Sequence, residues 1–120
     1  MNRPVHFEIL ADDPDKIAAF YREVLSWEIE REGPVAYWLV TTGPEDARGI
    51  NGAIMHRAFP QAVINTVAVE SLQQTLERVN QAGGKVIHGP NEIPGVGMHA
   101  YCVDPEGNMF GILEPVPAMA

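Results

Sequence analysis

The sequence lacks most features of secreted and membrane-spanning proteins. It contains a single cysteine, Cys102, so no disulfide can form within the chain, and a lone thiol inside an apolar run usually behaves as a small buried hydrophobic group. No apolar run approaches the roughly 18 residues of a membrane span. The start MNRPVHFEILADD has neither the basic region nor the apolar run of a signal peptide. We therefore expect a cytoplasmic protein, and we assign Cys102 no catalytic role.

Positive charge is also scarce in this chain. Eight Lys and Arg residues stand against 16 Asp and Glu residues, for a formal net charge of -8, and no basic cluster is present to attract phosphates. Nucleic acid and anionic membranes are therefore poor partners. What is present is 46% hydrophobic and 20% charged residues over 120 positions, which is ordinary for a globular protein. We expect one domain over residues 1–120.

The first half of the sequence predicts a strand, a helix and three further strands. Asp13 is a suitable helix cap and Pro14 suits the first helical position, so a helix is expected over residues 14–25. Its apolar residues recur at helical spacing and would all pack against a sheet; they are Ile17, Phe20, Tyr21, Val24 and Leu25. Alternation and strand-forming residues place the strands of this half at residues 5–10, 27–31, 36–42 and 52–57.

The second half repeats this order of elements. Ser71 is expected to cap a helix that ends at Gly83-Gly84. Gly89-Pro90 and Pro94-Gly95 are expected to bound a loop, and His88, just before Gly89, is expected to be a loop residue as well. The predicted strands cover residues 63–69, 85–87, 96–103 and 108–113. Matching the two helix caps places His6 opposite Ile64 and Glu8 opposite Thr66. A ferredoxin-like βαββαβ fold is the competing interpretation, and the count of eight strands favours a repeated βαβββ unit.

Two long segments carry a family resemblance. The segment HFEILADDPDKIAAFYREVLSWEIE resembles the first strand, helix and second strand of the vicinal oxygen chelate superfamily, which includes glyoxalases, bleomycin-resistance proteins and extradiol dioxygenases. The segment LQQTLERVNQAGGKVIHGPNEIPGVGMHAYCVDPEGNMFGILEP is similar to the second module of that superfamily. The resemblance implies an α+β fold of two βαβββ modules, residues 1–58 and 62–116, whose curved sheets form a half-open barrel. It also implies a small-molecule ligand in the concave face and, commonly, a homodimer.

Metal-dependent members of the superfamily have four inward ligands, on the first and last strands of each module. By resemblance, these positions fall on His6, Met55, Ile64 and Gly111. Only His6 carries a side chain suited to a transition metal, whereas a stable site needs three or four donors. We therefore expect no metal cofactor; if a divalent metal is bound after all, His6 would be its ligand.

A second ligand set stays open because a one-residue register slip exchanges the two faces of a strand. Such a slip would bring His56 toward His6 and Glu8, and Glu114 lies three residues beyond the lost final ligand. The simpler interpretation of His56 is a solvated strand end, and that of Glu114 is a surface residue near the end of the chain.

His6 and Glu8 are the candidate catalytic residues. They share one face of the first strand, and the resemblance directs that face toward the cavity, with Phe7 and Ile9 contacting the first helix. An inward carboxylate beside an imidazole would serve as an acid–base pair. In the alternative interpretation, His6 and Glu8 both face solvent.

Further residues are candidates for binding a ligand. Tyr37 and Trp38 are adjacent on a strand, so only one can face the cavity, and Trp38 is expected in the core. His99 and Tyr101 share a strand face and could both offer polar contacts. The full set of candidate ligand-binding residues is Tyr37, Met55, Asn65, His99 and Tyr101.

Two classes of function follow from the sequence. The first is a metal-free protein that binds or sequesters a small apolar or aromatic molecule. The second is a glyoxalase-like lyase or isomerase, or a dioxygenase-type enzyme, that uses His6 and Glu8 or a residual metal site. The donor count on the concave face discriminates between them, since the fold alone supports both.

Overall fold

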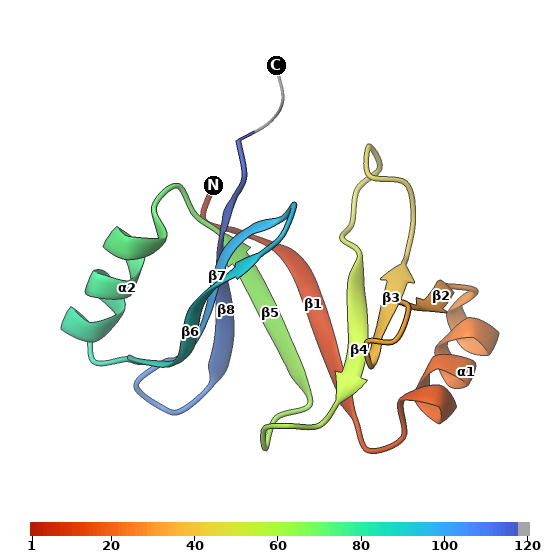
Figure 1. Cartoon of the computed structure of the whole chain (residues 1–120). Coiled ribbons are helices and arrows are strands. Elements are labelled where there is room, and N and C mark those ends of the chain that lie inside the picture. The colour runs from red at the N-terminus through yellow and green to blue at the C-terminus, as the bar shows by residue number, and fades with distance from the viewer. Residues whose placement is uncertain (118–120) are drawn as a thin grey trace. The chain divides into compact units, whose positions relative to one another are not determined.

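The computed structural model describes residues 1–117 of the chain. Within this range the elements occur in the order β1-α1-β2-β3-β4-β5-α2-β6-β7-β8 (Figure 1). They belong to two compact units: residues 6–64 form the N-terminal unit, and residues 1–5 with the described residues from 65 onward form the C-terminal unit. Neither helix in this range is long and apolar enough to cross a membrane.

The N-terminal unit is a four-stranded sheet with a helix on one face (Figure 1). Its elements are β1 (Arg3–Ala11, which begins in the other unit), α1 (Pro14–Leu25), β2 (Glu28–Arg31), β3 (Tyr37–Thr41) and β4 (Gly52–His56). The strand order is β2-β3-β4-β1, with β4 parallel to β1 and the other two pairs antiparallel. Helix α1 begins where the sequence predicts, because an Asp13 carboxylate oxygen accepts from the backbone N–H of Lys16 at 3.2 Å.

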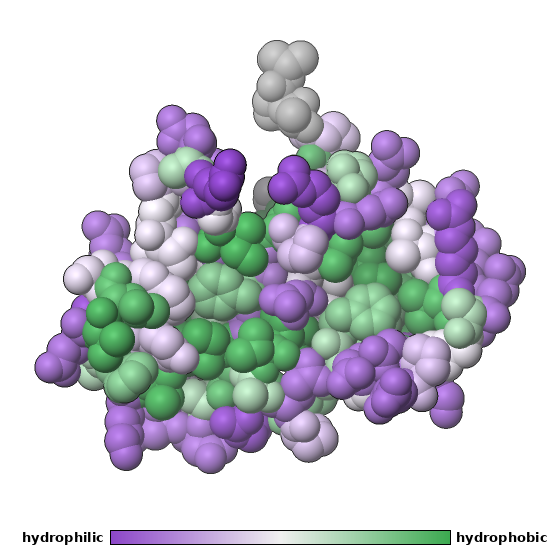
Figure 2. Space-filling model, turned by 180° about the vertical axis from the view of Figure 1, so that it is seen from behind, coloured by the Kyte–Doolittle hydropathy of each residue, from purple (hydrophilic) through white to green (hydrophobic). Residues whose placement is uncertain are grey.

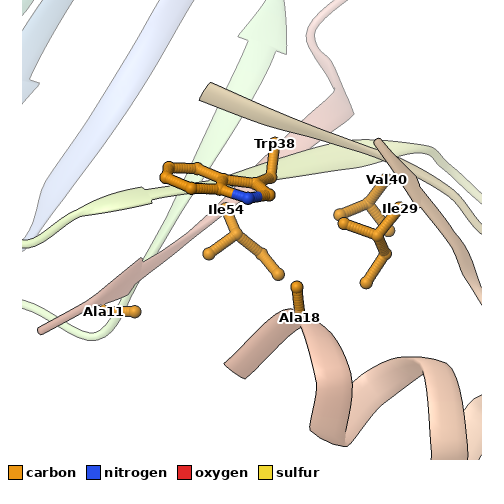
Figure 3. Close-up of a cluster of buried hydrophobic side chains, with 6 residues drawn as sticks. All are labelled: Ala11, Ala18, Ile29, Trp38, Val40 and Ile54. Carbon is orange, nitrogen blue, oxygen red and sulfur yellow. The ribbon is translucent and has the colours of Figure 1, made fainter. Parts of the chain in front are cut away.

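The core of the N-terminal unit lies between α1 and the sheet. Ala18 on α1 is fully buried and points at side chains of β2, β3 and β4 (Figure 3). The cluster comprises Ala11, Ala18, Ile29, Trp38, Val40 and Ile54. Trp38 is 3% exposed and its indole N–H donates to Asp15 at 3.1 Å, which confirms its expected place in the core.

The apolar face of α1 is only partly covered by the sheet. The sequence predicts all five apolar side chains of this face against the sheet, but only Ile17 and Tyr21 pack there. Phe20, Val24 and Leu25 are 54%, 57% and 48% exposed, and hydrophobic surface is visible at the left of Figure 2, where α1 lies. The prediction is wrong for Phe20 and Val24 because the buried stripe is centred on the small residue Ala18, and these two side chains lie beside it. Leu25 is on the same stripe as Ala18 but is the last residue of the helix.

The C-terminal unit repeats the same arrangement. Its elements are β5 (Val63–Ala68, which begins in the N-terminal unit), α2 (Leu72–Gln81), β6 (Lys85–Ile93), β7 (Gly97–Val103) and β8 (Met109–Pro115). The strand order is β5-β8-β7-β6, with β5 parallel to β8 and the other pairs antiparallel. Ser71 Oγ caps α2 by accepting from the N–H of Gln74 at 3.2 Å. Both units are therefore βαβββ, which confirms the α+β fold class and rules out the ferredoxin-like alternative.

The core of the C-terminal unit contains the single cysteine. Cys102 is fully buried with Leu72, Ala100 and Ile112, and burial raises the pKa of its thiol. The expectation of a small buried hydrophobic group is confirmed.

Strand β6 differs from the sequence-based expectation. It continues through Gly89-Pro90 to Ile93 instead of ending in a loop, so His88 is a strand residue paired opposite Tyr101. Register shifts on both sides of His88 let the strand pass its proline without continuous pairing.

Candidate functional site

Side chains of β1 alternate between the two faces of the N-terminal sheet. Phe7 and Ile9 pack against the core cluster beside α1, as the sequence predicts. His6 and Glu8 therefore lie on the opposite face, away from α1. Glu8 is only 5% exposed, so the alternative interpretation that places it in solvent is wrong.

Tyr37 joins His6 to Glu8 on this face. The Tyr37 hydroxyl donates to Oε2 of Glu8 at 2.8 Å and lies 2.9 Å from Nε2 of His6. Strand β4 runs between β1 and β3, and it places the small residue Ala53 directly beside Glu8. Ala53 leaves room for the long tyrosine side chain to cross β4. The two predicted catalytic residues are thus connected through a third residue rather than to each other.

The direction of these hydrogen bonds fixes the proton positions of the imidazole. A hydroxyl has one hydrogen, and that of Tyr37 is donated to Glu8, so its oxygen must accept from Nε2–H of His6. Burial lowers the pKa of His6 below its ordinary value of 6.5, while the Glu8 carboxylate opposes part of that shift. At neutral pH His6 is therefore neutral, with hydrogen on Nε2 and a lone pair on Nδ1.

Nδ1 of His6 is open to a ligand. The recorded contacts of the His6 side chain are the Nε2 hydrogen bond and stacking on the Tyr37 ring. Within residues 1–117, no buried side-chain nitrogen or oxygen is left without a hydrogen-bond partner. Because Nδ1 has no partner, it is not buried, and its lone pair is available to accept a hydrogen bond.

The surroundings of the chain from His6 to Glu8 are apolar. Pairing places Leu10 and Tyr37 on either side of Met55, and Glu8 and Leu39 on either side of Ala53. The face away from α1 thus carries the aliphatic and thioether side chains Leu10, Leu39, Ala53 and Met55, of which Leu39 and Met55 are accessible while Leu10 and Ala53 are buried. Met55, one of the candidate ligand-binding residues, is half-buried and pairs with Tyr37.

The remaining candidates lie in the C-terminal unit and do not all come together. His99 and Tyr101 share one face of β7, with ring centroids 4.5 Å apart. Asn65 is exposed and lies on the same face of β5 as Val67, which packs against the α2 core. Asn65 is thus on the opposite face from Thr66. Asn65 is therefore separated from the buried polar residue of its own strand.

Thr66 is a buried polar residue of β5 that is absent from the candidates named from the sequence. It is 3% exposed and pairs with Gly111 of β8. A side chain at Gly111 would collide with Thr66 Oγ1, and its Cβ would lie 2.8 Å from Nε2 of His99. Thr66 and His99 thus fill the space over the position that the resemblance assigns to the final glutamate ligand. The signal for Thr66 was present, since matching the helix caps sets it opposite Glu8.

The alternative ligand residues lie elsewhere. His56 pairs with Ala11 and stands edge-on to Trp38, at 6.0 Å, on the α1 face, so it does not join His6 and Glu8. Glu114 is half-buried and is more than a plain surface residue, because its carboxylate accepts from the backbone N–H of Leu72 at 2.9 Å. Glu114 thereby satisfies an otherwise unpaired donor at the start of α2.

The donors on the face of His6 do not fit a transition-metal site. Across the described residues, no group of three or more His, Cys, Asp and Glu side chains is arranged to hold a metal ion. Nε2 of His6 and the Glu8 carboxylate both bond to the Tyr37 hydroxyl that stands between them. These groups fit hydrogen bonding to an organic ligand better than coordination by three or four donors.

Comparisons with known proteins agree with this architecture. The family model described as "Glyoxalase/Bleomycin resistance protein/Dioxygenase superfamily" matches residues 3–112. The chain is 32% identical over 113 residues to "Putative glyoxylase CFP32" of Mycobacterium bovis; the match covers 92% of this chain and 43% of that protein. The chain thus spans less than half the length of this curated relative.

Solved structures with low sequence identity share the fold. A glyoxalase/bleomycin resistance protein/dioxygenase superfamily member from Vibrio splendidus superposes with a TM-score of 0.67 at 18% identity, covering 95% of this chain and 98% of that one. Methylmalonyl-CoA epimerase from Mycobacterium tuberculosis superposes with a TM-score of 0.65 at 15% identity, covering 95% and 88%. At these identities the likeness shows the fold alone.

Proposed function

Since this chain belongs to the glyoxalase/bleomycin resistance protein/dioxygenase superfamily, we propose that it binds a small, largely apolar organic molecule without a resident metal. The ligand lies on the face of the N-terminal sheet that points away from α1. The observation that carries this proposal is the hydrogen-bonded chain from His6 through Tyr37 to Glu8, set among aliphatic side chains. A few polar groups on an otherwise apolar surface are typical of small-molecule sites.

The chemistry of this face limits the class of ligand. Nδ1 of His6 accepts hydrogen bonds, so the ligand should carry a donor such as a phenolic or alcoholic hydroxyl. The strand segments of the N-terminal unit contain one basic residue, Arg31, and it lies over the Trp38 ring on the other side of the sheet. These strand segments therefore place no Lys or Arg on the face of His6. With Glu8 as the nearby charge, an anionic ligand is disfavoured. The expected ligand is therefore neutral and aromatic or aliphatic, with one hydrogen-bond donor.

A titration with matched probes tests this proposal. We would follow backbone amide NMR shifts on addition of 1-naphthol, 1-methoxynaphthalene, which lacks the donor, and 1-naphthoate, which is an anion. Naphthol should bind best and shift amides of β1, β3 and β4. His6→Ala should weaken naphthol binding, whereas His56→Ala, a histidine on the opposite face, should not. Equal binding of naphthol and methoxynaphthalene, or equal effects of the two variants, would contradict the proposal.

The same hydrogen-bonded chain favours a second candidate function, acid–base catalysis by a lyase or isomerase. When Nδ1 of His6 accepts a proton from a carbon acid, the imidazolium keeps Nε2–H on Tyr37, which is in turn held by the Glu8 carboxylate. His6 would then be the base, with Tyr37 and Glu8 as positioning residues. The epimerase among the similar structures supports this candidate through its fold only.

Hydrogen–deuterium exchange distinguishes catalysis from binding. The acetoacetyl thioester of N-acetylcysteamine has acidic carbon-bound protons whose loss into deuterium oxide is followed by proton NMR. An exchange rate that wild type raises and His6→Ala does not would support catalysis. Equal rates with the two proteins would leave binding as the function of this face.

Metal analysis tests the metal-free part of the proposal. The protein would be exposed to nickel, zinc, manganese and ferrous iron, dialysed, and analysed by elemental mass spectrometry, alongside His6→Ala. We expect much less than one metal ion per chain, unchanged by the substitution. Near one ion per chain, lost in the variant, would contradict this part of the proposal.

A further inference from the structure

A cleft lies within the C-terminal unit, along α2. Its volume is about 510 Å³, which is within the range of small-molecule sites. It is lined by Leu72, Gln73, Leu76, Glu77, Asn80, Pro90, Met98 and Glu114. Met98 and Glu114 are paired neighbours on β7 and β8 and, like Leu76, lie on the α2 side of the sheet. The cleft is therefore on the opposite face from the cluster of His99 and Tyr101.

The floor and the rim of this cleft differ in chemistry. Leu72 is 5% exposed, and Leu76 and Met98 pack against the core, so the floor is apolar. Of the two carboxylates in its lining, Glu77 is exposed on α2 and Glu114 is half-buried on β8. No Lys, Arg or His contributes to the lining.

Glu114 is held in place and still presents an open oxygen. Its Oε1 accepts the backbone N–H of Leu72 at 2.9 Å, which orients the carboxylate. Its Oε2 has no recorded partner, and because no buried side-chain oxygen in residues 1–117 is left unpaired, Oε2 is not buried. The helix N-terminus, which would otherwise attract an anion, already faces this carboxylate.

We propose that this cleft binds a small organic cation, with its ammonium group at Oε2 of Glu114 and its apolar body over Leu72, Leu76 and Met98. Charge complementarity selects the cation: the lining holds two carboxylates and no basic group, so an anion is repelled and a neutral molecule gains only the apolar contacts. This site is independent of the proposed function, because its residues lie on α2, β6, β7 and β8 and do not include His6, Tyr37 or Glu8.

Three probes that share one phenyl ring and differ in charge test the proposal. Amide NMR shifts are followed with 2-phenylethylamine as its hydrochloride, with 2-phenylethanol, and with 3-phenylpropionate. We expect the amine to bind most tightly and to shift amides at the start of α2 and on β8, with weaker binding at higher salt. Equal affinity for the amine and the alcohol, shifts confined to other elements, or no saturable shift with the amine would overturn the proposal.

Matched substitutions separate this site from the general attraction of a chain with net charge -8 for cations. Glu114→Gln removes the charge but keeps an amide oxygen for the Leu72 N–H, so α2 should keep its start. It should weaken binding of the amine by about two- to fivefold, the range of an exposed ion pair, and leave binding of the alcohol unchanged. Glu106→Gln, at an exposed residue outside the cleft lining, should change neither. Equal loss in both variants would refute the proposed site.

Discussion

Replacing Tyr37 with phenylalanine removes the hydroxyl that is hydrogen-bonded to both His6 and Glu8. The ring stays, so the packing of β3 against β4 is kept, while the hydrogen bonds of the hydroxyl with His6 and Glu8 are lost. The matched control is Tyr21→Phe. The Tyr21 ring stacks on Trp27 on the other side of the sheet, and its hydroxyl makes no hydrogen bond among the described residues.

The expected cost follows from the burial of Glu8. A hydrogen bond to a charged group contributes about 1.5–3 kcal/mol. The bond from the Tyr37 hydroxyl is accepted by the carboxylate of Glu8, a residue that is only 5% exposed. The bond from His6 is between neutral groups and contributes about 1 kcal/mol. Glu8 has a further interaction, which limits the loss. We therefore expect Tyr37→Phe to lower the free energy of unfolding by about 2–3 kcal/mol in total. Tyr21→Phe should change it by less than about 0.5 kcal/mol.

Urea unfolding followed by circular dichroism measures both variants. A lower midpoint with an unchanged slope would show a loss of stability without a change in the denatured state. Nitrogen-15 NMR of His6 provides a second measure: wild type should carry its proton on Nε2, and Tyr37→Phe should relax that preference. If both tyrosine variants have the stability of wild type, the hydroxyl does not hold His6 and Glu8 as described, and the proposed function loses its main support.

The other predictions concern His6, glycine packing and assembly. NMR titration should give His6 a pKa below 6.5, and Glu8→Gln should lower it further by removing the opposing charge; a higher pKa in that variant would refute this. His6 binds a proton less readily in the folded protein than in the unfolded protein. The free energy of unfolding should therefore fall as pH drops from 6.5 toward the pKa of His6 in the folded protein, and His6→Gln should make that fall smaller. Gly52→Ala places a Cβ against the carbonyl and ring of Phe7 and should destabilise the folded protein by about 1–3 kcal/mol. The control Gly43→Ala, whose Cβ would have no atom within 4 Å, should be nearly neutral. Equal denaturation midpoints for the two variants would contradict this prediction. The family resemblance predicts a homodimer. A dimer with an interface of standard size should persist at roughly tens of micromolar protein, so light scattering that shows a monomer there would remove that prediction.

Local chemistry determined the parts of the fold that the sequence predicts well. Asp13 and Ser71 cap the two helices because a short polar side chain can satisfy a backbone N–H three residues ahead without help from the rest of the chain. Alternation on β1 similarly separated Phe7 and Ile9 from His6 and Glu8, since the two-residue period of a strand needs no tertiary information. The repeated order of elements followed from these local signals.

Tertiary structure decided the contacts that depend on register and on distant partners. Tyr37 reaches Glu8 only because β4 lies between β3 and β1 with a small residue, Ala53, at the crossing. Glu114 meets the start of α2 because β8 ends beside that helix, 42 residues away along the chain. The exposure of Phe20 likewise depended on which face of α1 the sheet covers.

The sequence alone determined the class of fold and the two residues, His6 and Glu8, around which the candidate site is built. It could not determine that a tyrosine hydroxyl stands between them, or which imidazole nitrogen remains open. Periodicity specifies the face on which a side chain lies, but hydrogen bonds between strands depend on pairing partners and register, which are fixed only when the whole sheet has formed.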